Sequence, residues 1–325
     1  MLGNVNKKAW GSEKFEFPAQ PLSLSKTWGT AFRLFKNTLE KVWYIPAIFY
    51  GILFMLGLWG GNDTHFVSSL HHFIHFISNQ SIPLPVILLL IVAGLTSFVI
   101  VYMLILFVKA VIMHRMYNLT TDKPTIGLWQ SCKKVFHKLP NLIVAELILL
   151  ALLSVGALCV FIPYLFWHTQ FGLEYKNTPH LFIAIMFIIG MLWIIAWSIF
   201  RLFAIIFIPL ILFDNQNSWE AIKSSCSLVR KRWWRTFLCF IVPPIYYMVI
   251  LMLILIPIFL LASLLHSIAG DFTWVPGIIK SGTAIVKLFI RILLLLYLYS
   301  LQLILFNDYK IRHELESVIG DASSK

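Results

Sequence analysis

One short basic pattern occurs three times in this chain, as GTAFRLFKN at 29–37, QSCKKVFHK at 130–138 and SSCSLVRKR at 224–232. Aligning Ala31 with Cys132 and Cys226 places the copies 101 and 94 residues apart. Each copy has the spacing of an amphipathic helix, with small or apolar residues on one stripe and cations between them, except that the third copy places Arg230 at one stripe position. Tryptophan lies close to every copy. The pattern therefore predicts three like units, each beginning with a helix that lies in a membrane interface.

Long apolar runs follow these copies in pairs. Hydrophobic residues make up 59% of the chain and charged residues only 12%, whereas about a quarter of a soluble domain is charged. A run of about 20 apolar residues crosses a bilayer, and it must be helical because lipid offers the backbone no hydrogen-bond partner. Such runs lie at about 42–60, 84–108, 142–167, 181–213, 237–262 and 283–306. We therefore expect an all-α integral membrane protein with six transmembrane helices.

The spacing predicts one membrane domain over residues 23–306. It consists of three repeats of a cytoplasmic amphipathic helix plus a transmembrane hairpin, at about 23–108, 125–213 and 218–306. Each repeat has two spans, so all three run in the same sense, as parallel copies. The flanking segments are a polar N-terminal segment at 1–22, which lacks the apolar stretch of a signal peptide, and a C-terminal tail at 307–325.

Positive charge concentrates on one side of the predicted bundle. Of the 26 Lys and Arg residues, 21 fall in 1–41, 109–140, 214–236 and after 306, the segments on the same side as the termini. This asymmetry is the positive-inside signal, so we expect both termini in the cytoplasm. The net charge of +12 then reflects topology and lipid headgroups, and no nucleic-acid partner is expected.

Basic and aromatic residues of the amphipathic helices, with a basic stripe on the last span, are candidates for binding lipid headgroups. Members of the stripe recur at intervals of seven and four, which places them on one helix face. The candidates are Arg33, Lys36, Lys133, Lys134, Lys138, Arg230, Lys231, Arg232, Trp233, Trp234, Arg235, Lys280, Lys287 and Arg291. The helices either only anchor and orient the spans or form a collar that binds anionic phospholipid or a partner. For the stripe, snorkelling from the helix end is the alternative.

Two charged residues, Glu146 and Arg201, fall within predicted spans. Charge at membrane depth is expensive and marks candidate functional positions. Glu146 follows Pro140, which we expect to separate the second amphipathic helix from its span. Adjacent spans let Glu146 and Arg201 meet, pairing two charges that are costly alone. The pair is either structural or part of a substrate or proton site.

Signatures of catalysis are absent from the sequence. It contains no G-x-S-x-G, H-E-x-x-H, P-loop or G-x-G-x-x-G motif, so neither enzyme activity nor a cofactor is expected. The four cysteines fit no zinc template, and no pair of them lies in an outer loop. His65, His72 and His75 share one face of an expected interfacial helix at 66–78, where metal ligation is the alternative to a polar face.

The segments PLILFD at 209–214 and WEAIKSSCSLVRKRWW at 219–234 carry a family resemblance. This stretch resembles a pattern in YciC-like bacterial inner-membrane proteins and in the membrane domain fused to some glycerophosphodiester phosphodiesterases. In that pattern, proline and aliphatics precede an acidic residue, Glu-Ala, a serine, a basic patch and aromatics entering a span. The resemblance implies a bacterial inner membrane and a role near lipid metabolism or envelope upkeep. The phosphodiesterase catalytic domain has no counterpart here, so its activity does not carry over.

Three classes of function follow. The expected one is a non-enzymatic multi-pass inner-membrane protein for lipid binding or envelope homeostasis, with anionic phospholipid as its partner. A transporter or channel with a site near Glu146, Arg201 and Arg291 is the second class, although spans so rich in aliphatic and aromatic residues disfavour a wet pore. The third is a membrane subunit whose partner is a second copy or another membrane protein.

Overall fold

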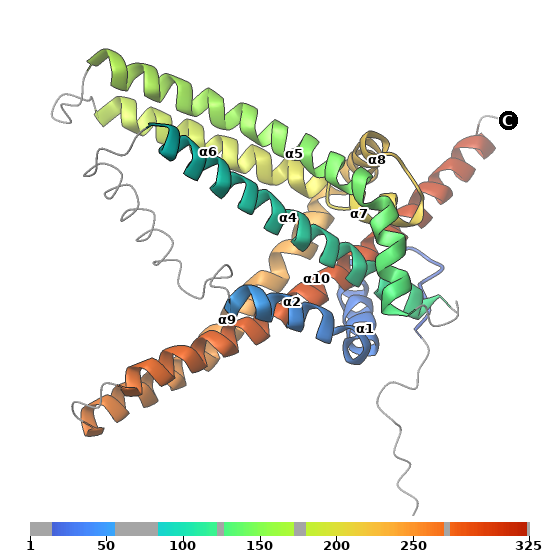
Figure 1. Ribbon diagram of the computed structural model, residues 1–325. Helices are drawn as coiled ribbons and strands as arrows, with labels where there is room; N and C mark the ends of the chain where they lie inside the picture. Colours follow the sequence, from blue (N-terminus) through green and yellow to red (C-terminus); the bar gives the residue numbers. More distant parts are fainter. Residues whose placement is uncertain (1–14, 56–83, 122–126, 172–179, 270–273, 324–325) are drawn as a thin grey trace, which may run out of the picture. The chain divides into compact units, whose positions relative to one another are not determined.

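The computed structural model describes residues 15–55, 84–121, 127–171, 180–269 and 274–323. Its helices are α1 (Leu24–Val42), α2 (Tyr44–Met55), α4 (Leu84–Thr120), α5 (Leu128–Phe171), α6 (His180–Phe203), α7 (Phe207–Phe213), α8 (Ser218–Arg230), α9 (Trp233–Ala269) and α10 (Trp274–Ser323) (Figure 1). No strand occurs within these ranges. The all-α fold class is therefore confirmed for the part of the chain that the structure describes.

Within the described residues, five helical segments are long and apolar enough to cross a membrane. They are Val92–Thr120, Leu128–Val155, Phe187–Phe213, Trp233–Ile258 and Ser281–Ile319. These segments indicate a helical membrane protein. The first expected span, at 42–60, is represented by the 12-residue α2, and 56–60 lie outside the described residues. A span at 42–60, which would bring the total to six, therefore stays a prediction.

The chain divides into two compact units, one of residues 1–133 with 238–304 and the other of 134–237 with 305–325. In the first unit, α1 packs against α2 and α4. It does so with one stripe of buried residues spaced three or four apart, which are Thr27, Ala31, Leu34, Thr38 and Val42. The cations Arg33 and Lys36 lie off this stripe and are exposed. α1 thus has one buried and one exposed face, but the buried face packs against α2 and α4, whereas the sequence predicts that it lies in a membrane interface.

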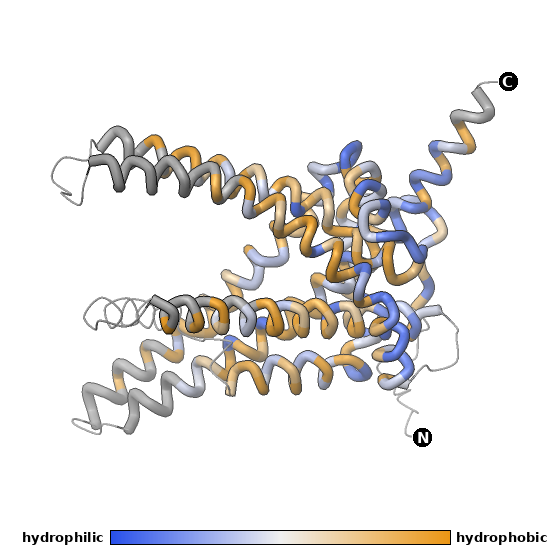
Figure 2. Tube along the Cα trace, turned by 45° about the horizontal axis from the view of Figure 1, so that its top comes forward, coloured by the Kyte–Doolittle hydropathy of each residue, from blue (hydrophilic) through white to orange (hydrophobic). Residues whose placement is uncertain are grey.

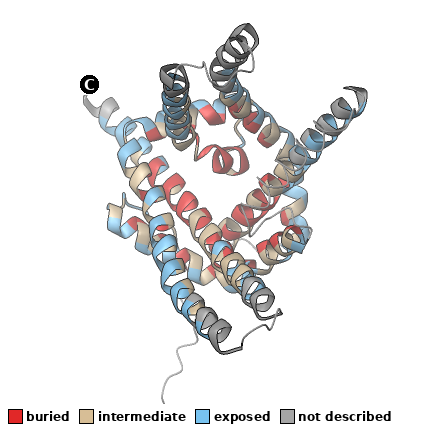
Figure 3. Cartoon of the chain, turned by 90° about the vertical axis from the view of Figure 1, so that its left-hand side faces the viewer, coloured by how far each residue is buried: buried red, intermediate tan, exposed pale blue. Residues whose placement is uncertain are grey.

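In the second unit, the short α7 is buried from Phe207 to Leu212 and packs against α8, which also contacts α6. α8 again buries one helical stripe, which consists of Ser218, Ala221, Ile222, Ser225 and Val229. Buried residues are red in Figure 3. The apolar α7 is therefore part of the core of this unit, and the amphipathic α8 packs over it.

The fourth apolar run, at 181–213, is not one continuous helix, because α6 ends at Phe203 and α7 begins at Phe207. Ser225 of α8 stabilises the break. Its hydroxyl donates to the carbonyl oxygen of Phe203 at 2.7 Å and accepts from the backbone N–H of Ile206 at 3.2 Å. The side chain thus satisfies one group at the end of α6 and one just before α7, which would otherwise be orphaned.

One expectation about helix ends, at Pro140, was wrong. α5 continues through Pro140 without ending there. A proline removes only one backbone hydrogen bond from a helix, so a long helix can pass through it with a local distortion. At the other end of the chain, α10 extends into the expected C-terminal tail as far as Ser323.

The long helices expose apolar side chains over much of their length. Leu192 on α6 and Leu253 on α9 are 61% and 66% exposed, and similar residues recur along both helices. Figure 2 shows that hydrophobic residues dominate the long helices, whereas hydrophilic residues gather in α8 and at the end of α10. Apolar surface of this extent on a polypeptide indicates contact with lipid.

Candidate functional site

The turn between α8 and α9 gathers positive charge in the second unit. α8 ends at Arg230, and Lys231 and Arg232 form the turn before α9 begins. A backbone hydrogen bond of 2.8 Å from the N–H of Arg232 to the carbonyl oxygen of Val229 closes the turn. Arg235 follows within the first turn of α9. Four cations are therefore confined to one end of these two helices.

Glu316, near the end of α10, binds two of these cations. Its carboxylate accepts a hydrogen bond from Lys231 Nζ at 3.0 Å and a second one from the guanidinium of Arg232. The Glu316 side chain is 42% exposed and that of Lys231 is 72% exposed. The contact is thus an ion pair at the surface, in which one carboxylate serves two cations.

Asp308, two helical turns earlier on α10, makes a similar but buried arrangement. Its Oδ2 lies 3.0 Å from Arg235 Nη1 and 3.0 Å from Arg312 Nε, and its side chain is only 1% exposed. The next residue, the buried Tyr309, shares a 2.6 Å hydrogen bond with the hydroxyl of Thr236. These contacts fasten the end of α10 to the start of α9.

Lys231, Arg232 and Arg235 were predicted to meet lipid phosphates, and the structure places carboxylates against all three. The carboxylates were missed, although a signal was present. Asp308 and Glu316 are eight residues apart with Arg312 midway, so all three fall on one helix face. The face exists because α10 continues as helix beyond residue 306.

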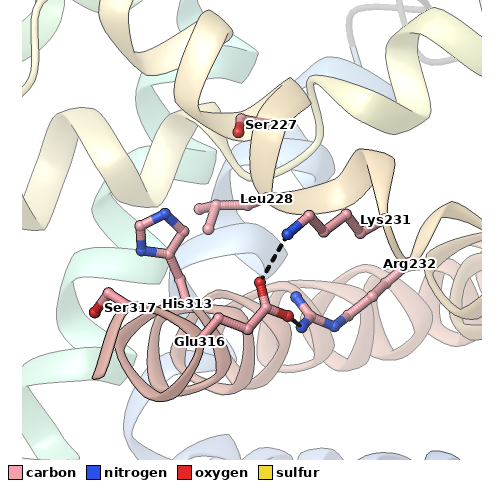
Figure 4. Close-up of a pocket in the computed structure, with 7 residues that line it drawn as sticks. All are labelled: Ser227, Leu228, Lys231, Arg232, His313, Glu316 and Ser317. Carbon is pink, nitrogen blue, oxygen red and sulfur yellow. Dashed lines mark hydrogen bonds and ion pairs between the residues drawn. The ribbon is translucent and has the colours of Figure 1, made fainter. Parts of the chain in front are cut away.

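A pocket of about 240 Å³ opens between the α8–α9 turn and the end of α10. It is lined by Ser227, Leu228, Lys231, Arg232, His313, Glu316 and Ser317. Figure 4 shows the Glu316 carboxylate pointing toward both cations, with the His313 ring on the same helix beside it. A second pocket of about 270 Å³ shares Ser227, Leu228 and His313 and extends toward Asp214 and Lys310, which pair at 2.9 Å. Hydroxyl, imidazole and cationic donors therefore surround the first pocket.

Exposed tryptophans lie on both helices that the turn joins. Trp233 and Trp234 are 42% and 56% exposed, and their rings meet edge to face at 5.1 Å between centroids. Trp219 at the start of α8, which was not among the candidates, is 64% exposed. Arg230 is exposed as well. Indole rings and cations side by side are typical of a membrane interface.

The remaining candidates lie on α1, α5 and α10. Among them, the side chains of Arg33, Lys36, Lys133, Lys134 and Arg291 are exposed, and those of Lys138 and Lys287 are half-buried. Lys280 belongs to α10, but its side chain lies outside the described residues, as do His65, His72 and His75. The structure therefore leaves the stripe on the last span and the outer histidines as predictions.

Glu146 and Arg201 meet, as the sequence predicts. Nη1 and Nη2 of Arg201 donate to the two carboxylate oxygens of Glu146 at 2.8 and 2.9 Å, which joins α5 to α6 (Figure 1). Glu146 is 3% exposed and Arg201 is 38% exposed. A bidentate pair of this kind has the strongest and most directional geometry open to these two groups. It satisfies both ends of the Glu146 carboxylate.

The cysteines and possible metal ligands of the described residues also bear on the sequence predictions. Cys132, Cys226 and Cys239 are free thiols. Burial raises the pKa of the Cys226 thiol, which keeps it protonated and weakly nucleophilic at neutral pH. Among the described residues, no group of three or more His, Cys, Asp or Glu side chains could hold a metal ion.

Residues 133–302 match the family described as Domain of unknown function (DUF7847). The chain belongs to this family. No curated protein and no solved structure matches it. The matched range of this DUF7847 protein contains Glu146, Arg201 and the whole α8–α9 turn, and it stops before Asp308 and Glu316. The carboxylates that pair with the turn therefore lie outside the region that defines the family match.

Proposed function

We propose that this protein is a non-enzymatic, multi-pass membrane protein that binds anionic phospholipid at the cytoplasmic surface of a bacterial inner membrane. The observation that carries the proposal is the α8–α9 turn, where Trp233 and Trp234 are exposed beside Arg230 and Lys231. Tryptophan favours the headgroup region, and cations there attract anionic lipid. The strongly apolar α9 begins directly after these residues.

The proposed architecture has six spans in three repeats, with both termini in the cytoplasm. Three observations support it: the amphipathic α1 and α8, each followed closely by an apolar helix; five segments able to cross a membrane; and the excess of cations in alternate connecting segments. The resemblance of 209–234 to YciC-like proteins and to the membrane domain of glycerophosphodiester phosphodiesterases supports the assignment to lipid or envelope biology.

Lipid binding is preferred to transport because of how Glu146 is held. A substrate site needs a charge that a ligand can reach, and this carboxylate is 3% exposed with both oxygens bonded to Arg201. Breaking such a buried pair is expensive. We therefore assign Glu146 and Arg201 the role of bracing α5 against α6.

The proposal predicts that the protein retains anionic lipid selectively. Native mass spectrometry would be applied to the full chain released from nanodiscs that hold equal amounts of phosphatidylcholine and phosphatidylglycerol. We expect enrichment of phosphatidylglycerol in the wild type. The variant Lys134→Gln/Arg230→Gln should lower that enrichment by roughly fivefold or more, since each cation near an anionic surface contributes on the order of 1 kcal/mol.

The matched control is Lys7→Gln/Lys8→Gln, which removes the same charge from the polar N-terminal segment. It should retain the wild-type lipid ratio. Equal retention of both lipids by the wild type would contradict the proposal, and an equal loss in both double variants would reduce the effect to net charge. A co-purified partner chain in place of lipid would favour a subunit of a larger assembly.

A further inference from the structure

The pocket between α8 and the end of α10 has more positive than negative charge. Lys231 and Arg232 supply two cations, and Glu316 is the single carboxylate among its lining residues. Ser227 and His313 add groups that can donate hydrogen bonds, whereas the Ser317 hydroxyl already donates to the carbonyl oxygen of Glu314 at 2.7 Å. One carboxylate has two oxygens and one negative charge, so it leaves part of this donor capacity unused. An anion with more oxygens and more charge would use it better.

The two carboxylates of α10 differ in how easily a ligand could replace them. Asp308 is 1% exposed, and its partners Arg235 and Arg312 are 16% and 24% exposed. Glu316 is 42% exposed, and its partners Lys231 and Arg232 are 72% and 18% exposed, so the contrast lies in the carboxylate and in Lys231. Exposed ion pairs are weak and exchange readily, whereas buried ones resist disruption. The Asp308 contacts can therefore hold α10 in place while the Glu316 contact opens.

We propose that this pocket binds a phosphate monoester group, and that Glu316 occupies Lys231 and Arg232 until the phosphate displaces its carboxylate. A phosphate monoester carries about −1.5 to −2 charges at pH 7 and three strong acceptor oxygens. Arginine binds phosphate through two parallel N–H groups, and lysine binds it as a point charge. This inference rests on the proposed lipid function and specifies the headgroup chemistry. The exposed Trp233, adjoining Arg232, keeps the pocket within reach of a headgroup.

The first test uses inorganic phosphate and the full chain in detergent, with calorimetric titration. Glu316→Gln removes the internal competitor and should bind phosphate roughly fivefold more tightly than the wild type. In the wild type, phosphate can bind only to the fraction of molecules in which the Glu316 carboxylate has left the two cations, and this lowers the apparent affinity. Glu316→Asp keeps the charge on a shorter side chain and should fall between the two. Lys231→Gln/Arg232→Gln should lose binding.

The matched control is Glu314→Gln, which removes the same charge two residues away on α10 and should bind as the wild type does. If Glu316→Gln bound no more tightly than Glu314→Gln, the proposed competition would be overturned. If Lys231→Gln/Arg232→Gln kept wild-type affinity, the site itself would be wrong, and that result does not depend on how Glu316→Gln folds.

A second test separates a lipid headgroup from free phosphate. Nanodiscs would hold phosphatidic acid, a monoester, with phosphatidylglycerol, a diester of lower charge. With a lipid source, Glu316→Gln enriches phosphatidic acid over the wild type; with a soluble source, only the phosphate titration responds. Enrichment of phosphatidylglycerol alone would overturn monoester binding. If Lys134→Gln/Arg230→Gln retained phosphatidylglycerol as the wild type does while the phosphate titration was positive, the proposed lipid function would be wrong. The phosphate site would still be supported.

Discussion

At the scale of single residues, burial separates two carboxylates that look alike in the sequence. Asp308 and Glu316 each serve two cations, but only Asp308 is enclosed. Removing one partner of a buried ion pair leaves charge without compensation in a poorly solvated place. An exposed pair regains water when it is broken. The first contact is therefore structural, and the second is open to exchange.

This difference predicts opposite effects on stability. Asp308→Asn should lower the free energy of unfolding by about 3 kcal/mol, because Arg235 and Arg312 lose their common carboxylate in a mostly buried site. Glu316→Gln should change it little. Thermal unfolding of both variants in the same detergent measures the contrast. A fall in Tm for Glu316→Gln as large as that for Asp308→Asn would contradict the structural division.

At the scale of helices, Ser225 explains a break that apolar composition gives no sign of. The run at 181–213 is apolar on both sides of the turn between α6 and α7, so hydropathy alone predicts one helix. The break is stabilised by the Ser225 hydroxyl on α8, about 20 residues further along the chain, which forms hydrogen bonds with the backbone of Phe203 and Ile206. Such a tertiary contact leaves no periodic signal in the sequence.

Ser225→Ala should therefore destabilise the second unit. Ser225 is fully buried, so the substitution leaves the carbonyl of Phe203 and the N–H of Ile206 without their hydroxyl partner in the interior. The expected loss is about 2 kcal/mol in the free energy of unfolding, the cost of unsatisfied buried polar groups. Denaturation of the variant would be compared with that of Ser227→Ala, an exposed serine on the same helix. Equal stability of the two variants would argue against the bridging role.

Other elements were predictable because local physics determines them. The amphipathic stripes of α1 and α8 and the apolar runs follow from periodicity and length, which the sequence shows directly. The meeting of Glu146 and Arg201 followed from the cost of isolated charge in a span. The pairing of Lys231 with Glu316 did not, because the partners are 85 residues apart and no local spacing in the sequence links their two segments.

At the scale of the whole molecule, the number of spans decides the side on which each terminus lies. Five described segments are able to cross a membrane, and α2 is the start of an apolar run that continues to residue 60. Six crossings return the chain to the side where it began, whereas five do not. The three-repeat architecture requires the even number, since each repeat is a hairpin. Topology therefore tests the repeat and the role of α2 together.

We expect both termini to be cytoplasmic, as the cation distribution also requires. Green fluorescent protein fused to the N-terminus or the C-terminus, and expressed in a bacterial inner membrane, should fluoresce in both fusions because it folds in the cytoplasm. An alkaline phosphatase fused at either end should stay inactive. Fluorescence of only one fusion would mean an odd number of crossings. In that case α2 would lie in the interface with α1, and the first repeat would contribute one span instead of a hairpin.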